Sequence, residues 1–263
     1  MSLFGALAKL RDEPIGPMTT ARARMEGCRR LPIATRGAAF TEPLVDIRDL
    51  GLAGENFYYS HRNPPYWRRI EGSVPYLAVR RSVGEKLKRV NARLEAVTLE
   101  LYLFDAWRPR QVQAYFHDEW MPAELRRRDP ALEGDALTKA VERYWARPTE
   151  DATAPAPHAT GGALDLTLRW IGAEQLWMGS IFDDVTSIAH RDRFEGQGEP
   201  ESFSDGEARA NRRLLHWAMV EEGFAGHPDE WWHFSWGDQI WASLTGAPAA
   251  LYGLAEAPTF AVR

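Results

Sequence analysis

The segment 155–168, PAPHATGGALDLTL, places a histidine before two glycines and then an aspartate inside an apolar, strand-like run. An isolated carboxylate is costly to bury unless a cation compensates its charge. A hydrolytic zinc site needs three protein ligands of the nitrogen or oxygen type and one open position. His158 and Asp165 of this segment, with the distant His233, can supply two imidazoles and one carboxylate. The two glycines would let the chain turn tightly, so that His158 and Asp165 approach one ion.

Two further residues could complete hydrolytic chemistry around such an ion. Glu230 precedes His233 by three residues, close enough to serve an attacking water as general base and then the leaving group as general acid. Residues 230 and 233 of a regular strand would point to opposite faces. Glu230 must therefore lie in a turn at the strand entrance, which the preceding GHPD favours. Arg108 could neutralise the oxyanion that develops on an attacked carbonyl.

Each of these residues also has an ordinary structural interpretation. A lone His-x6-Asp spacing is weak evidence, since His158 could be a loop histidine and Asp165 a surface strand residue. His233, between two aromatic residues, could be a hydrogen-bonded core histidine, and Arg108 could simply pair with Asp105. The remaining histidines are expected to be structural or on the surface: His61, His117, His190, His216 and His227.

The composition narrows the class of protein. A chain of 263 residues can form one substantial core, and a net charge of −5 gives no electrostatic case for nucleic acid. The single cysteine excludes an internal disulfide framework and any multi-cysteine zinc site. The sequence has no apolar run of about 18 residues for a membrane span and no basic start typical of a signal peptide. We therefore expect a cytoplasmic location.

The spacing of apolar residues predicts an α+β fold. Helical spacing predicts helices, and alternating residues such as Leu99, Leu101 and Leu103 predict strands. Ser82 and Ser204, each followed three residues later by a glutamate, predict capping boxes at two helix starts. The expected helices span 82–96, 108–120, 137–146 and 204–224, and the expected strands span 97–107, 161–170 and 230–237. We expect a small, mainly antiparallel sheet flanked by helices in a single domain.

Two segments differ in composition from these elements. Residues 1–40 are rich in arginine, which predicts a loosely held N-terminal arm ahead of a main domain at 41–263 that carries all the candidate residues. Residues 51–76 are rich in aromatic residues, Gly and Pro, which favours an ordered loop layer.

Three segments together resemble a known family. PHATGGALDLTL, DEWWHF and FDAWRP are similar to the motifs of the zinc D-alanyl-D-alanine dipeptidases, the VanX-like metallopeptidases. That family has the signature S-x-H-x-x-G-x-A-x-D, followed later in the chain by E-x-W-H. The resemblance covers about residues 45–240 and includes GENFYY, MGSIFDD and NRRLLHWAMVEEGF. Several motifs matching in the same order make the resemblance specific.

The resemblance implies a cofactor and a role for each central residue. It implies one Zn²⁺ per chain, held by His158, Asp165 and His233. It also implies that Glu230 is the catalytic base and that Arg108 stabilises the transition state.

The resemblance further implies how the substrate is held. Asp183, in MGSIFDD, would bind the free ammonium group of the substrate. An aminodipeptidase must hold this positively charged amino terminus at a fixed distance from the metal. Asn56, Phe57 and Tyr58 would wall the pocket. Ala156 stands where the family has a serine two places before the first histidine. That serine is not a ligand, so zinc binding is unaffected, but the change alters how the substrate amine or backbone is held.

The function implied for the domain 41–263 is zinc-dependent hydrolysis of D-Ala-D-Ala or a closely related dipeptide with a free amino terminus. Its partner is thus a small dipeptide, with no nucleic acid and no membrane span. Two alternatives are a peptidoglycan D,D- or L,D-carboxypeptidase or endopeptidase with the same metal centre, and a non-catalytic zinc-binding protein on this scaffold. Asp183 and the lack of a signal peptide count against the first alternative. The presence of all five central residues counts against the second.

Overall fold

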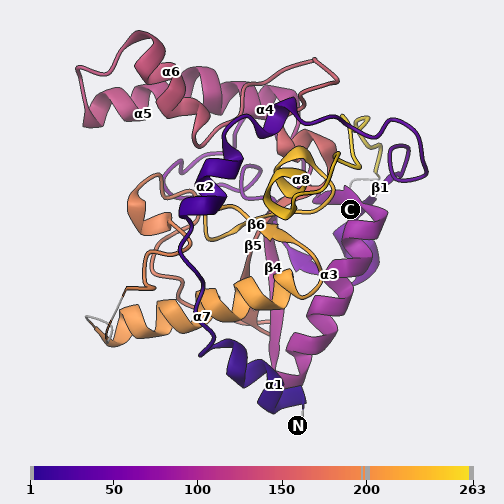
Figure 1. Cartoon of the computed structure of the whole chain (residues 1–263), viewed down its shortest axis with the longest axis vertical. Coiled ribbons are helices and arrows are strands. Elements are labelled where there is room, and N and C mark those ends of the chain that lie inside the picture. The colour runs from indigo at the N-terminus through magenta and orange to yellow at the C-terminus, as the bar shows by residue number, and fades with distance from the viewer. Residues whose placement is uncertain (1–2, 197, 199–201, 261–263) are drawn as a thin grey trace.

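The centre of the protein is a five-stranded sheet with helices packed around it (Figure 1). The computed structural model describes residues 3–196, 198 and 202–260. Strand β2 pairs with β4 in parallel, and the other neighbouring pairs are antiparallel. In sheet order the strands are β2 (Ala53–Gly54), β4 (Leu99–Asp105), β5 (Ala163–Trp170), β7 (His233–Ser235) and β6 (Ala225–Gly226). The predicted α+β fold with a mainly antiparallel sheet is confirmed.

The register of the sheet gathers polar residues at one end. The alternate leucines of β4 are buried, as predicted, while the residues between them are half-buried. After a bulge in β4, Asp105 pairs with Asp165 on β5, and Asp165 pairs with His233 on β7. Three neighbouring strands therefore present polar side chains close together, although the residues are far apart in the sequence.

Helices and a second, two-stranded sheet surround this core. Helix α3 buries Val83, Leu87, Val90 and Leu94 along one face, as their spacing predicts. Figure 1 shows α4, α5 and α6 grouped at the upper end of the molecule and α1 and α7 at the lower end. The helices are α1 (Leu3–Leu10), α2 (Thr19–Met25), α3 (Arg81–Leu94), α4 (Arg110–Ala114), α5 (Met121–Arg128), α6 (Gly134–Glu142), α7 (Phe203–Val220) and α8 (Gln239–Thr245). A π-helical stretch, Tyr115–Trp120, joins α4 to α5, and β1 (Leu44–Asp46) pairs with β3 (Ala78–Arg80).

The predicted capping boxes at Ser82 and Ser204 are wrong. The Ser82 hydroxyl donates to Glu42, 40 residues earlier in the chain, rather than capping α3. Helix α7 starts earlier than expected, and Ser202 caps it by accepting from the backbone N–H of Asp205. A tertiary contact and a small shift of the helix start thus override a local pattern.

The N-terminal arm is packed against the body, which corrects the prediction that it is loosely held. Helix α1 packs against α7 and buries Leu7. Arg11 pairs with Glu207 at 3.1 Å, and Arg22 pairs with Asp192 at 2.8 Å. The arm is therefore held by apolar burial and by ion pairs.

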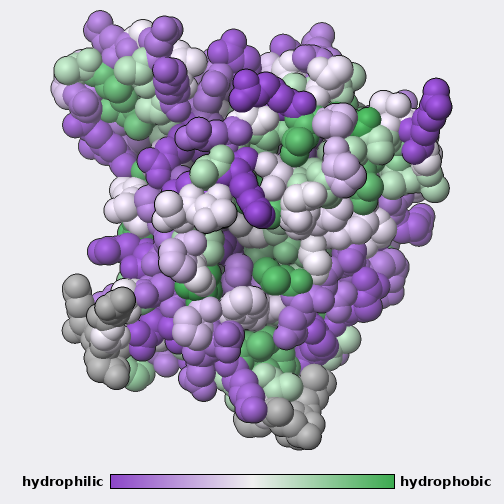
Figure 2. Space-filling model, in the orientation of Figure 1, coloured by the Kyte–Doolittle hydropathy of each residue, from purple (hydrophilic) through white to green (hydrophobic). Residues whose placement is uncertain are grey.

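The loop layer and the surface agree with the sequence. The predicted loop layer, residues 51–76, forms turns and bends apart from the two residues of β2, Ala53–Gly54, which the prediction missed. On the face shown in Figure 2, the apolar side chains lie in small, separate groups among polar ones. Within the described ranges, no helix combines the length and the apolar character needed to cross a membrane.

The packing of the arm gives a first prediction. Leu7→Ala should lower the free energy of unfolding by about 2 kcal/mol or more, because it leaves a cavity under α1. Denaturant unfolding monitored by fluorescence measures the change. Ile171→Ala, at a half-exposed position, is the control and should change stability by less than about 0.5 kcal/mol. Equal stability of Leu7→Ala and the wild type would mean that the arm adds nothing to the fold.

Candidate active site

Three segments bring His158, Asp165 and His233 together. His158 lies on the short helical turn Pro157–Thr160, Asp165 lies within β5, and His233 opens β7. Gly161 ends the turn with a left-handed backbone (φ +72°), where a Cβ would lie 2.3 Å from the side chain of Leu44. His158 Nε2 lies 3.2 Å from His233 Nδ1, and His233 Nδ1 lies 3.1 Å from Asp165 Oδ1. One nitrogen or oxygen atom from each residue lies within 4.8 Å of the others.

The proton on His158 is fixed on the side away from this cluster. His158 Nδ1 is 2.8 Å from the carbonyl oxygen of Ala106, which can only accept, and 3.2 Å from Asp105 Oδ2. Burial lowers the pKa of His158 well below its ordinary value, so the ring is neutral. A neutral imidazole that donates through Nδ1 carries a lone pair on Nε2. The Nε2 lone pair of His158 therefore points into the cluster.

His233 is held in the opposite tautomer. Its Nε2 lies 3.3 Å from Ser235 Oγ, and that hydroxyl donates to Asp238 Oδ2 at 2.8 Å. Because the serine proton is committed to Asp238, Ser235 Oγ accepts from His233 Nε2. Burial lowers the pKa of His233 to about 3, so its Nδ1 also carries a lone pair that faces the cluster.

The donor set therefore fits a metal ion. Two imidazole lone pairs and Asp165 Oδ1 converge in a buried space, and Asp165 Oδ1 has no hydrogen-bond partner. Three acceptors without a proton between them repel one another unless a cation lies among them. Two nitrogens and one carboxylate oxygen, with outer atoms fixed by hydrogen bonds, are the ligands of an open zinc site.

Arg108 is locked beside this cluster. Its Nε donates to Asp105 Oδ2 and its Nη1 donates to Gln113 Oε1, both at 2.8 Å, while Nη2 lies 3.4 Å from Asp165 Oδ2. Its guanidinium carbon lies 4.6 Å from the ring centre of Trp145. The guanidinium group is therefore held by hydrogen bonds at Nε and Nη1, and its Nη2 faces the space around Asp165. Gln113 was not foreseen from the sequence, because its role depends on a contact across a helix turn.

Glu230 lies outside β7, after the turn that GHPD forms, as predicted. Its Oε2 is 3.6 Å from His233 Nδ1. Burial raises the pKa of Glu230 well above its ordinary value, and neighbouring carboxylates add to the effect. The preceding residue, Asp229, is tied to Arg22 at 2.6 Å and to Arg143 at 3.0 Å, which anchors the turn.

Arg191 fixes the same turn from behind. This fully buried guanidinium donates to the backbone oxygens of His227, Glu230 and His233 at 2.9–3.0 Å. The irregular segment before β7 thus obtains hydrogen bonds that a longer strand would have supplied. Sequence reasoning missed this arginine, because it lies about 40 residues from its partners.

Asp183 closes one end of the site. Its Oδ2 accepts from the hydroxyls of Tyr58 (2.8 Å) and Tyr66 (2.9 Å). Burial raises the pKa of Asp183 to about 7, and the charge of Asp165 adds to the shift. Asp183 has φ +59°, a left-handed backbone that a short polar residue tolerates. The resemblance implies that Tyr58 walls the pocket; in the structure its hydroxyl holds Asp183, and Tyr66, which was not foreseen, does the same.

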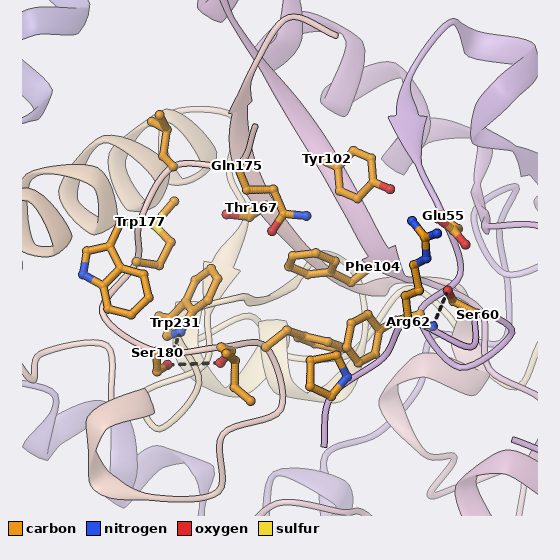
Figure 3. A pocket seen from close by; sticks show the side chains of 16 residues that line it. Glu55, Ser60, Arg62, Tyr102, Phe104, Thr167, Gln175, Trp177, Ser180 and Trp231 are labelled. Carbon is orange, nitrogen blue, oxygen red and sulfur yellow. Dashed lines mark hydrogen bonds between the residues drawn. The ribbon is translucent and has the colours of Figure 1, made fainter. Parts of the chain in front are cut away.

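Phe57 lies elsewhere, which corrects the expectation that it walls the metal site. Its ring packs edge-on against Phe182, with ring centres 4.8 Å apart, and lines a second cavity of about 440 Å³. Figure 3 shows this cavity, with Phe104, Thr167 and Trp231 around it. Phe57 and Tyr58 lie in a turn that begins at Asn56, and there the Phe57 ring faces the second cavity while the Tyr58 hydroxyl reaches Asp183. Asn56 is also structural, because its side chain accepts from the Tyr58 N–H and donates to the Tyr76 carbonyl.

The central residues share one cavity of about 980 Å³. We call the buried polar residues of its lining the inner part: Arg108, His158, Asp165, Asp183, Glu230 and His233. We call the half-buried and exposed charged residues, with the arm residues beside them, the outer part: Arg22, residues 25–27, Arg29, Lys139, Glu142 and Arg143. The arrangement combines a metal-type donor set, a carboxyl group with a raised pKa and a fixed cation, which are the parts needed for amide hydrolysis.

The hydrogen bond behind His233 gives a second prediction. Ser235→Ala removes the acceptor that orients His233 and should weaken metal binding about 10- to 100-fold. Competition of the protein with a chromophoric chelator for Zn²⁺ measures the affinity. Ser180→Ala is the matched control, because Ser180 is a buried hydroxyl that accepts from Trp231 in the second cavity. Equal affinities in all three proteins would show that Ser235 does not support a metal ligand.

Known proteins match the part of the chain that carries these site residues. The peptidase M15 family model, described as D-ala-D-ala dipeptidase, matches residues 73–246, which include the six inner residues of the cavity. A D-alanyl-D-alanine dipeptidase of Synechocystis sp. is 32% identical over 214 residues, which cover 76% of this chain and 84% of the relative. The D-alanyl-D-alanine dipeptidase of Escherichia coli is 32% identical over 52% of this chain and 54% of its own length. That of Streptomyces coelicolor is 30% identical over 61% of this chain and 75% of its own length. The chain therefore belongs to the D-alanyl-D-alanine dipeptidase family of peptidases, as its motifs predict, and is a metallodipeptidase.

Proposed function

We propose that the protein is a zinc-dependent dipeptidase that hydrolyses D-Ala-D-Ala, or a closely related dipeptide with a free amino terminus. One observation carries the proposal: a buried donor set suited to zinc shares a cavity with Glu230, Arg108 and Asp183. These are the groups that a dipeptidase needs to activate water, stabilise an oxyanion and recognise a free ammonium group. The family membership supports the choice of substrate.

His158, Asp165 and His233 would hold one zinc ion. When bound, zinc supplies Lewis acidity that polarises the scissile carbonyl and lowers the pKa of water. Both histidines are already neutral and oriented by their outer hydrogen bonds. Binding therefore requires no proton to leave either ring, and the metal would compensate the buried charge of Asp165.

Glu230 would move the proton. Its side chain lies beside the metal-facing nitrogen of His233 without being part of the converging donor set. A carboxyl group with a raised pKa is a stronger base than an exposed one. In this proposal Glu230 takes a proton from the attacking water and then delivers it to the nitrogen of the leaving D-alanine.

Arg108 would stabilise the negative charge that develops on the carbonyl oxygen. Its Nη2 faces Asp165, while Asp105 and Gln113 fix its other edges. A donor that is already oriented needs no reorganisation when the charge appears, so its stabilisation is specific to the transition state.

Asp183 would bind the substrate ammonium. Tyr58 and Tyr66 donate to it, and their rings pack on Phe116, so a wall of buried aromatic side chains lies behind the carboxylate. A longer peptide would have to extend its chain through this wall. The arrangement therefore supports a dipeptidase over the alternative endopeptidase function.

Glu230→Gln tests the proton-transfer role. We expect kcat for D-Ala-D-Ala to fall about 10²- to 10⁴-fold, because the amide cannot accept a proton. The zinc content should stay at the wild-type level, since Glu230 is not among the three donors. Glu26→Gln, at an exposed position lining the same cavity, is the control and should keep near-normal turnover. Near-normal turnover in Glu230→Gln would remove this residue from the mechanism.

Asp183→Asn tests recognition of the amino terminus. The wild type should cleave D-Ala-D-Ala much faster than its N-acetyl analogue. Asp183→Asn should lower kcat/KM for the free dipeptide about 10- to 100-fold, through loss of a charge-assisted hydrogen bond. Asp184→Asn changes the charge of the next residue, which bonds Thr186 instead, and should keep the preference. The assignment fails if the wild type cleaves both compounds equally well.

A further inference from the structure

The N-terminal arm forms one wall of the catalytic cavity. Residues 25–29 line the same cavity as the metal-type donors, although the family match begins only at residue 73. Arg22, on α2, pairs with Asp229, which directly precedes Glu230. The arm therefore reaches the site from outside the matched region and is anchored beside it.

Arg29 is a cation of this wall that has no anionic partner. Its Nη2 donates to the backbone oxygens of Ala154 and Arg147, and its Nε is buried without a hydrogen-bond partner. In the part of the chain that the structure describes, Arg29 forms no ion pair. Arg22 and Arg143, which line the same cavity, both pair with Asp229.

A half-buried cation without an anion is unfavourable, because burial weakens its hydration. The pKa of Arg29 is lowered by burial, in agreement with this environment. Because Nη2 is bonded to backbone oxygens and Nε is buried, a carboxylate that entered the cavity would pair with the guanidinium from its Nη1 side. Only a ligand that carries a carboxylate would gain binding free energy from this ion pair.

Charged residues of both signs line the cavity. The buried ones are Asp165, Asp183, Glu230 and Arg108, and the more exposed ones include Arg29, Lys139, Glu26 and Glu142. A free dipeptide carries an ammonium at one end and a carboxylate at the other, so a substrate whose ammonium binds Asp183 needs a cation in the same cavity for its carboxylate.

We propose that Arg29 binds the C-terminal carboxylate of the dipeptide and that the arm is therefore a specificity element of the active site. This inference rests on the proposed function and adds the recognition of the second end of the substrate. The pair of Asp183 and Arg29 would then restrict the enzyme to peptides with two free ends.

The test compares two substrates that differ only at the C-terminus, D-Ala-D-Ala and D-alanyl-D-alaninamide, in the full-length zinc-loaded protein. The wild type should prefer the acid about 10- to 100-fold in kcat/KM, the range for a hydrogen bond to a charged group. Arg29→Gln should lose most of this preference, mainly through a higher KM for the acid, with little change for the amide. Arg29→Lys should keep part of the preference, because it retains the charge but not the fork.

Arg24→Gln is the matched control. Arg24 is an exposed arm residue whose guanidinium donates to the backbone oxygen of Leu244, and it does not line the cavity. It should show the wild-type preference for the acid. Thermal unfolding of each variant identifies any loss of folding, and Arg29→Lys then serves in place of Arg29→Gln.

The outcomes separate this inference from the proposed function. Cleavage of the acid and the amide at equal rates by the wild type would overturn the role of Arg29 and leave the dipeptidase function intact. An equal fall for both substrates in Arg29→Gln would also overturn it, because only a structural role affects both. Absence of cleavage of either substrate by the wild type would instead overturn the proposed function.

Discussion

The burial of Asp165 between two neutral histidines is the constraint on which the site depends. A carboxylate in the centre of a sheet is unfavourable unless nearby positive charge stabilises it. Here the outer nitrogens of His158 and His233 are committed to Ala106 and Ser235, so both rings turn lone pairs toward Asp165, and Arg108 reaches it only at 3.4 Å. The folded chain therefore creates a space with a deficit of positive charge, which a divalent cation satisfies.

The fold maintains this unfavourable arrangement through cations placed around it. Arg108 contacts Asp105 and Asp165 from one side. Arg191 holds the backbone of the segment that carries Glu230 and His233. These buried guanidinium groups orient the chain by hydrogen bonds to fixed acceptors, so the polar site is rigid before a substrate arrives. Such rigidity is what electrostatic stabilisation of a transition state requires.

The sequence predicts those features that depend on local spacing. The alternation in β4 and the turn before Glu230 follow from the identities of adjacent residues, and the structure contains both. The pairing of His158 with His233 could be inferred from chemistry, because few arrangements compensate a buried aspartate. The orientation of Phe57 could not be inferred, since periodicity gives no face in an irregular loop. Gln113 and Arg191 act through contacts that no local pattern records.

The prediction that the N-terminal arm is loosely held shows a further limit of reasoning from local sequence, and this limit affects a wall of the candidate site. A mixed, arginine-rich composition is typical of solvated segments, so residues 1–40 resemble a loose extension. The acids that bind these arginines lie about 170–210 residues away, on segments that approach the arm only in the folded chain. The arginines that suggested a solvated segment therefore form the ion pairs that attach the arm to the rest of the protein.

In the proposed function, the residues around the cavity would make one metal-type site selective for small peptides. Asp183 and its two tyrosines meet packed aromatic rings, which would stop a peptide chain whose amino terminus binds Asp183. In the outer part of the cavity, the wall is formed by the arm, whose position depends on Arg22 and the acids it binds. In the proposed function, peptide length would be limited by a wall built into the loop layer and by a wall added by the N-terminal segment. The metal-type donors come from other segments, so reaction chemistry and substrate length would depend on different parts of the chain.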